Sequence, residues 1–142
     1  MAGIRVSTSV KRIEVNDNGD YIELNFSDNS FPDRFYAMLE SIQGRADDVQ
    51  AKAAELEEKY GKDKDVLARN QAGLYRKFHE EIMGDVDALF GPETCKKVFG
   101  DIVPGIELFD DFFTQLTPFF EEYGKERAAK LNKYSAGRTS NV

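Results

Sequence analysis

The sequence predicts an α+β fold that is mainly α, with an N-terminal β-hairpin packed on an antiparallel helical bundle. Before residue 27, apolar residues alternate with a period of two, as in a strand with one buried face. From Phe31 onward they recur at spacings of three and four, as on one face of a helix. Glycine and proline interrupt this second pattern at 91–92 and at 103–105, where helices are expected to end.

The chain has 142 residues, a length typical of one domain. We therefore expect a single domain over residues 1–134, which contains a hairpin region at 1–29 and a helical region at 30–134. Residues 135–142 are expected to form a flexible tail.

The hairpin is predicted from Asn18-Gly19, because a two-residue type I′ turn needs positive φ at both positions and these residues tolerate it. Pairing outward from this turn keeps the apolar residues of both strands on one face. The expected pairs are Val15 with Ile22, Ile13 with Leu24, and Lys11 with Phe26.

An earlier alternation runs through Ile4, Val6, Thr8 and Val10. Its phase changes by one residue after Val10. This change indicates a bulge or a strand break at that point.

The first helix is expected to start at Ser30-Phe31-Pro32-Asp33, which offers a hydroxyl cap, a proline in the first turn and an acid there. Gly44 is expected to weaken or end this helix. Beyond it, a narrow apolar stripe runs from Val49 to Tyr60 among charged residues. Length alone leaves open whether residues 45–90 form one helix or a helical hairpin with a turn at 61–65.

The C-terminal region is predicted to hold two more helices. Pro92-Glu93 suits the first turn of a short helix that ends at Gly100, and Val103-Pro104-Gly105 is a connector. A broad apolar stripe from Leu108 to Tyr123 predicts the last helix. Pro118 lies within it and is expected to kink or split it.

The chain is acidic, with 26 Asp and Glu against 19 Lys and Arg. This charge disfavours nucleic acid and anionic membranes as partners. Residues 125–142 are locally basic, which favours a solubilising helix end over a nucleic-acid contact. No apolar run approaches the ~18 residues that span a bilayer, and the first residues lack the apolar segment of a signal peptide. We expect a cytoplasmic protein.

The sequence predicts no catalytic, metal or cofactor site, and hence no enzyme. His79 is the single histidine, and Met83 stands where a zinc-protease helix needs a second one. Cys95 is the single cysteine, which excludes an intramolecular disulfide, and it is expected to be a small buried thiol. The segment Asn16 to Asp20 has some calcium-loop character, but Asn25 stands where the bidentate glutamate is required.

Phenylalanine is abundant, with 11 residues and no tryptophan. Five of them fall on one predicted helix, and each ring can bury about 150 Å² or more. Two interpretations stay open: a core contact with the helix that carries Leu74, Phe78 and Ile82, or a surface that binds a partner. The candidate partner-binding residues are Phe109, Phe112, Phe113, Phe119 and Phe120.

Several short segments, mostly structural, occur in a recognisable order after the hairpin. They are Phe26-Ser27-Asp28-Asn29-Ser30-Phe31-Pro32, Leu89-Phe90-Gly91-Pro92, Lys97-Val98-Phe99-Gly100-Asp101, Phe112-Phe113 before Pro118, and Lys133-Tyr134-Ser135. Over residues 10–135 this arrangement resembles the tail assembly chaperones encoded in tail modules of long-tailed phages and prophages of Gram-positive bacteria.

The resemblance implies a non-enzymatic, mainly helical protein in the cytoplasm of the bacterial host. Such a protein binds the tape measure protein, keeps its hydrophobic helices soluble, helps to recruit tail tube subunits and forms homo-oligomers. Other tail proteins are possible partners. The alternative is a structural component of the virion tail or the head-tail connector.

Overall fold

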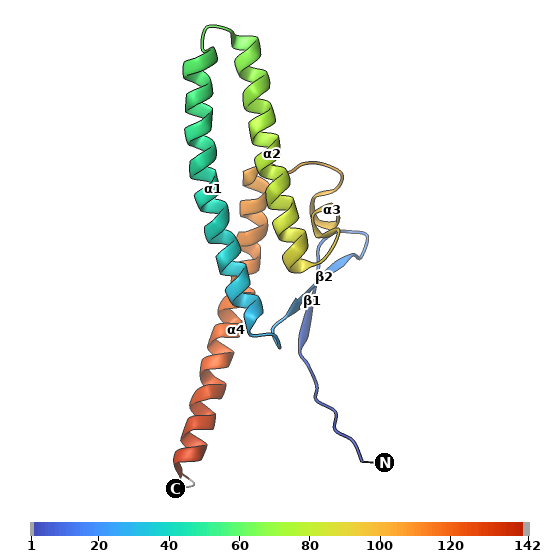
Figure 1. Ribbon diagram of the computed structural model, residues 1–142. Coiled ribbons are helices and arrows are strands. Elements are labelled where there is room, and N and C mark those ends of the chain that lie inside the picture. Colours follow the sequence, from blue (N-terminus) through green and yellow to red (C-terminus); the bar gives the residue numbers. More distant parts are fainter. Residues whose placement is uncertain (1, 141–142) are drawn as a thin grey trace. The chain divides into compact units, whose positions relative to one another are not determined.

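Helices make up most of the computed structural model, which describes residues 2–140 (Figure 1). The elements are β1 (Val10–Glu14), β2 (Tyr21–Asn25), α1 (Ser30–Tyr60), α2 (Lys64–Phe90), α3 (Thr94–Phe99) and α4 (Ile106–Ser140). The predicted class, mainly α with an N-terminal antiparallel hairpin, is confirmed.

The chain divides into two compact units, residues 1–105 and 106–142. The second unit consists of α4 and the residues that follow it. That residues 1–134 form one domain stays a prediction.

The two strands pair in a register that differs from the predicted one by two residues. The observed pairs are Val10 with Asn25, Lys11 with Leu24, Arg12 with Glu23, Ile13 with Ile22, and Glu14 with Tyr21. A shift of two residues leaves every side chain on its expected face. Ile22 and Leu24 are accordingly buried.

The turn explains the difference in register. The Val15 amide donates to the Asp20 carbonyl at 2.9 Å, which leaves the four residues 16–19 in the loop. The Asn16 side-chain oxygen accepts hydrogen bonds from the amides of Asn18 at 2.8 Å and Asp20 at 3.2 Å. Among residues 15–20, only Gly19 has positive φ, at 83°, so the predicted type I′ turn is wrong.

β1 begins at Val10 and pairs with β2 residue by residue through Glu14. The bulge or strand break predicted after Val10, where the alternation of apolar residues changes phase, is therefore wrong. Residues 2–9 have no regular secondary structure, and we call them the N-terminal arm.

Residues 45–90 form a helical hairpin, which settles the alternative left open by length. α1 ends at Tyr60 and α2 begins at Lys64, where the Asp63 carboxylate accepts a hydrogen bond from the Val66 amide at 3.2 Å. Contacts between the helices run in opposite order along the two segments, as in an antiparallel pair. They are Phe35 with Phe90, Arg45 with Glu81 and Asp85, and Gln71 with the Ala53 carbonyl.

α1 continues through Gly44, so of the two predicted effects, a weaker helix or its end, the end is wrong. Glycine in a helix costs only about 1 kcal/mol relative to alanine. Buried Met38 and Ile42 precede Gly44, and the ion pairs of Arg45 follow it. Together, these buried residues and ion pairs stabilise α1 by more than the low helix propensity of Gly44 destabilises it.

The core of the first unit lies where β2 meets the beginning of α1 and the end of α2. The ring of Phe31 contacts those of Phe26 and Phe90, each at a centroid distance of 5.8 Å. Phe35 and Leu24 are fully buried. Towards the distal turn of the helical hairpin the seam is thinner, since Val49, Ala53, Leu56 and Tyr60 are only half-buried.

α3 begins at Thr94, two residues later than Pro92-Glu93 predicts. Glu93 has positive φ (65°), as does Gly91 (122°), and an α-helix cannot include such residues. Instead, the Thr94 hydroxyl donates to the Gly91 carbonyl at 2.7 Å. The helix ends before Gly100, as expected.

α4 runs without interruption through Pro118, so of the two predicted outcomes, a kink or a split, the split is wrong. The hydroxyl of Thr117, the residue before the proline, donates to the Phe113 carbonyl at 2.9 Å. The backbone is helical to Ser140, where the sequence predicts a flexible tail from Ser135. Residues 141–142 of that predicted tail lie outside the described residues.

Candidate protein-binding surfaces

The five candidate phenylalanines all lie in the N-terminal half of α4. At 3.6 residues per turn, they and Leu116 fall within a sector of about 120° around the helix axis. The rings of Phe109 and Phe113 stack at a centroid distance of 6.1 Å, and those of Phe112 and Phe113 lie 5.9 Å apart. The helix thus gathers these rings into one continuous aromatic stripe.

The second unit contains no other described element that could cover this stripe from within the unit. An aromatic face of this size is not stable in water on a single helix. Its cover must come from the first unit of the same chain or from another protein. The two interpretations of the phenylalanines, a core contact or a partner-binding surface, therefore both remain open for α4.

A cavity of about 380 Å³ lies along β2 in the first unit. Its lining comes from β2 and the turn before it, and from the end of α2, the segment that follows it and α3. The lining residues are Gly19, Asp20, Tyr21, Ile22, Glu23, Phe90, Gly91, Pro92, Thr94 and Lys97. We call this cavity the β2 groove.

The β2 groove could not be predicted from local sequence, since its two walls are about 70 residues apart in the chain. Asn16 holds the walls together, because its side-chain nitrogen donates to the Lys97 carbonyl at 2.9 Å and to the Asp20 carboxylate at 2.8 Å. The same side chain shapes the hairpin turn and so fixes the position of the groove relative to β2.

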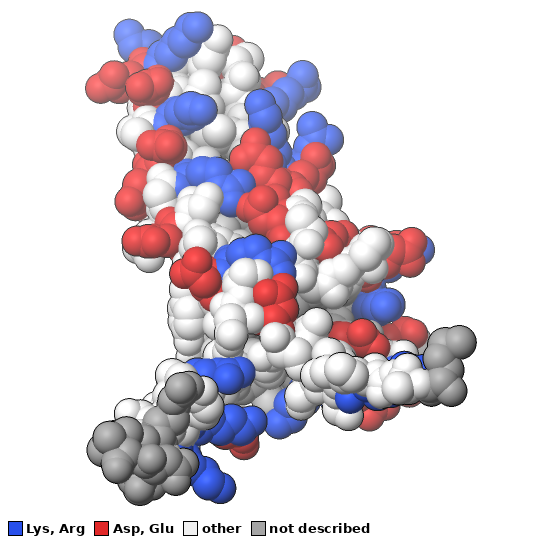
Figure 2. Space-filling model, turned by 60° about the horizontal axis from the view of Figure 1, so that its bottom comes forward, with Lys and Arg blue, Asp and Glu red and all other residues white. Residues whose placement is uncertain are grey.

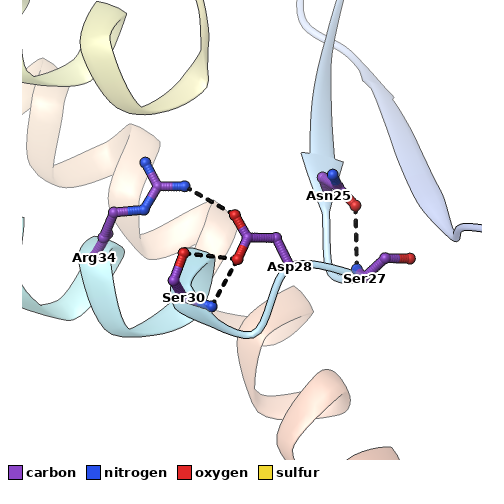
Figure 3. Close-up of polar contacts among 5 residues, drawn as sticks. All are labelled: Asn25, Ser27, Asp28, Ser30 and Arg34. Atoms are coloured by element: carbon purple, nitrogen blue, oxygen red, sulfur yellow. Dashed lines mark hydrogen bonds and ion pairs between the residues drawn. The ribbon is translucent and has the colours of Figure 1, made fainter.

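The turn between β2 and α1 is organised by one carboxylate (Figure 3). Asp28 accepts hydrogen bonds from the Ser30 amide at 2.9 Å and the Ser30 hydroxyl at 2.6 Å, and forms an ion pair with Arg34 at 3.3 Å. These contacts lower the pKa of Asp28 from its usual 3.8, with the hydrogen bonds from Ser30 as the largest cause. The Asn25 side chain accepts from the Ser27 amide in the same turn.

The distal half of the α1–α2 hairpin presents a mixed charged surface. Figure 2 shows basic and acidic side chains interspersed along it. Nearer the core, a shallow groove of about 360 Å³ runs between the two helices over Met38 and Leu89. Arg34 and Asp85 also line this groove.

Cys95 and His79 lie in different hydrogen-bonding environments. Cys95 is buried, its amide donates to Asp87, and its sulfur lies 3.7 Å from the Met83 carbonyl. Burial, followed by the nearby Asp87 carboxylate, raises the pKa of the thiol to about 12, so it is protonated near neutral pH. The His79 ring donates from Nδ1 to the Tyr75 carbonyl at 2.5 Å.

Within residues 2–140, no group of three or more His, Cys, Asp and Glu side chains is arranged to hold a metal ion. None of the helices in this part of the chain has both the length and the apolar character needed to cross a bilayer.

No curated protein and no solved structure matches the chain. A family model does match, over residues 18–141, which is most of the sequence and includes β2 and all four helices. The chain therefore belongs to DUF6673, a family of unknown function.

Proposed function

We propose that this protein is a tail assembly chaperone of a phage or prophage, and that it binds the tape measure protein through the aromatic stripe of α4. The observation that carries the proposal is the density of phenylalanine on one sector of a helix that forms a unit by itself. The order of short segments that resembles the tail assembly chaperones supports it.

The chemistry of the stripe suits a helical client. An amphipathic helix offers its apolar residues at spacings of three and four, and an aromatic stripe on a second helix can cover them. The net charge of −7 keeps such a complex soluble. The protein acts in the cytoplasm of the bacterial host, without cofactor or catalysis, and associates with further copies of itself.

The test is co-expression with the tape measure protein encoded in the same genome. We expect a soluble complex of fixed stoichiometry, measured by co-purification and light scattering, whereas the tape measure protein expressed alone is insoluble. Failure of the two proteins to co-purify would contradict the proposal. Retention of this protein in purified virions would favour the alternative, a structural part of the tail or the head-tail connector.

Two variants separate binding from folding. Phe112→Asp and Phe119→Asp each place a charge in the stripe, whereas the matched control Thr114→Asp places the same charge on the opposite side of α4. We expect the two stripe variants to lose co-purification at least tenfold while their circular dichroism stays that of the wild type. If they unfold the protein and Thr114→Asp does not, the stripe is core and the proposed binding site is wrong.

A further inference from the structure

The N-terminal arm has the residue pattern of a β-strand, but within residues 2–140 it pairs with no strand. Ile4 and Val6 alternate with polar residues, and their side chains are 86% and 84% exposed. Such exposure of two β-forming apolar residues in succession is typical of a segment that pairs with something else. Figure 1 shows the arm extending beyond β1 to the N-terminal end of the chain.

The arm is fixed at its base. The Ser9 amide donates to the Ser27 hydroxyl at 2.5 Å, and this hydroxyl lies 3.3 Å from the Ser9 carbonyl. The two contacts hold the start of β1 beside the end of β2. The rest of the arm therefore leaves the sheet from a defined point.

The outer edge of β2 offers the complementary surface. The hydrogen bond from Val15 to Asp20 makes these two residues a bonded pair, and bonded pairs alternate along an antiparallel ladder. Tyr21 and Glu23 therefore direct their backbone N–H and C=O groups away from β1. Both residues line the β2 groove.

A strand added at this edge would have an apolar surface on one side and an acidic residue on the other. One face of a strand beside β2 continues the face of Ile22 and lies towards Phe90 and Pro92, which line the groove. Ile4 and Val6 share one face of the arm, so both can cover this apolar surface together. Arg5 then lies on the opposite face, beside Glu23.

Charge favours β2 over the outer edge of β1. Arg5 is the one charged residue among residues 2–9. The β2 edge carries Glu23 and lies next to Asp20, whereas β1 carries two basic residues, Lys11 and Arg12, against one acid, Glu14. Opposite charges on neighbouring strands stabilise pairing and like charges oppose it.

More residues of the arm can pair with β2 when the two belong to different copies than when they belong to the same chain. To reach the outer edge of its own β2, the arm would have to cross that strand, a path of about 10 Å or two strand spacings. At 3.3 Å per residue this path consumes about three of the arm's residues. An arm that docks on another copy keeps residues 2–8 extended and leaves the contacts between Ser9 and Ser27 intact.

We propose that the N-terminal arm of one copy pairs as a third β-strand with the outer edge of β2 in a second copy, and that Ile4 and Val6 cover the β2 groove. The proposal specifies the surface for the self-association included in the proposed function. Its test needs no tape measure protein, so either proposal can fail without the other.

The first test measures mass by light scattering over a range of protein concentrations. We expect the wild type to reach the mass of two or more copies. Val6→Asp should shift this transition to at least tenfold higher concentration without changing the melting temperature measured where both proteins are monomeric, because Val6 is exposed in the isolated chain. The matched control Gln50→Asp places the same charge on an exposed site of α1 and should behave as the wild type.

The second test identifies the contact. A tagged chain with Arg5→Cys is mixed with an untagged chain with Glu23→Cys, since the proposal places these two side chains on the same face, and the mixture is oxidised mildly; native Cys95 is buried and does not interfere. We expect the mixed disulfide in at least fivefold excess over that formed when Gln50→Cys replaces Glu23→Cys. A wild type that stays monomeric, a mass that Val6→Asp leaves unchanged, or equal cross-linking to both sites would each overturn the proposal.

Discussion

Asp28 shows how one exposed side chain defines the start of a long helix. Its carboxylate lies two residues before Ser30, the first residue of α1, and accepts hydrogen bonds from the amide and the hydroxyl of that serine. Arg34, one turn into the helix, adds a positive charge. All three interactions favour the ionised carboxylate, which makes the stability of this turn depend on pH.

We expect Asp28→Ala to lower the melting temperature by a few degrees at pH 7. The folded-state pKa of Asp28 is lower than the unfolded value of 3.8. Its contribution is therefore present above pH 3.8 and is lost as the pH falls through the folded-state pKa. Thermal melts of both proteins from pH 7 to pH 2.5 should converge in acid. A constant difference across this range would contradict the role of the ionised carboxylate, and Asp47→Ala, at an exposed site in α1, is the control.

Cys95 is expected to resist thiol reagents in the folded protein. The rise of its pKa from 9.0 to about 12 lowers the thiolate fraction at pH 8 by about three orders of magnitude, and burial further limits access. The reaction with a chromogenic disulfide should therefore be slow in buffer and fast in denaturant. Comparable rates under both conditions would show that the thiol is accessible.

The same shift in pKa has a consequence for alkaline stability. Because the folded-state pKa of Cys95 is the higher one, its stabilising contribution is present below pH 9.0 and declines as the pH rises from 9.0 towards 12. Cys95→Ala should therefore be less sensitive than the wild type to alkaline pH in denaturant titrations. Equal sensitivity would contradict this assignment.

At the scale of elements, replacing two glycines of different backbone conformation by alanine is expected to change stability in opposite directions. A Cβ added at Gly44, inside α1, meets no atom within 4 Å, whereas Gly19 in the hairpin turn has φ of 83°. We expect Gly44→Ala to stabilise the protein by about 0.5–1 kcal/mol, because alanine has the higher helix propensity and the smaller loss of backbone entropy. Gly19→Ala should destabilise it by about 1 kcal/mol, because alanine is strained at positive φ.

Denaturant titration of both variants measures the two effects. Destabilisation by Gly44→Ala would mean that α1 is strained or closely covered at this residue. A neutral Gly19→Ala would mean that the hairpin turn tolerates another backbone conformation.

Local sequence was sufficient to predict where most elements end. Glycine and proline at 91–92, 100 and 103–105 act through their own backbone geometry, and the structure confirms the ends and the connector that they predict. Gly44 and Pro118 carry the same signals but lie inside helices. Contacts along α1 and α2 and the helical residues that flank Pro118 outweigh these local preferences.

The hairpin register was not predictable from the strands alone. Asn16 makes the four-residue turn, and one of its hydrogen bonds goes to the carbonyl of Lys97 in α3. A contact between residues so far apart in sequence leaves no local signal. The candidate phenylalanines could be identified from spacing alone, whereas the β2 groove needs the positions of β2 and the segment after α2 together.

At the scale of the whole molecule, the segment between the two compact units is the expected first site of proteolysis after the N-terminal arm. Asp101, Ile102 and Val103 are exposed, lie outside any helix or strand, and precede the boundary at Gly105. Limited digestion with elastase should cut here before it cuts α1 or α2, and mass spectrometry of the first fragments identifies the position. An initial cut at the distal turn of the helical hairpin, residues 61–63, would show that this turn opens more readily.

The three-residue turn between α1 and α2 also bears on how fast the protein folds. Contacts between helices adjacent in sequence require little loop-closure entropy, and such topologies fold in microseconds to milliseconds. Translation at about 5–20 residues per second needs seconds to complete residues 106–142. The helical hairpin can therefore be formed before the aromatic helix is synthesised, which shortens the time during which an incomplete chain exposes the phenylalanines of α1 and α2 to aggregation.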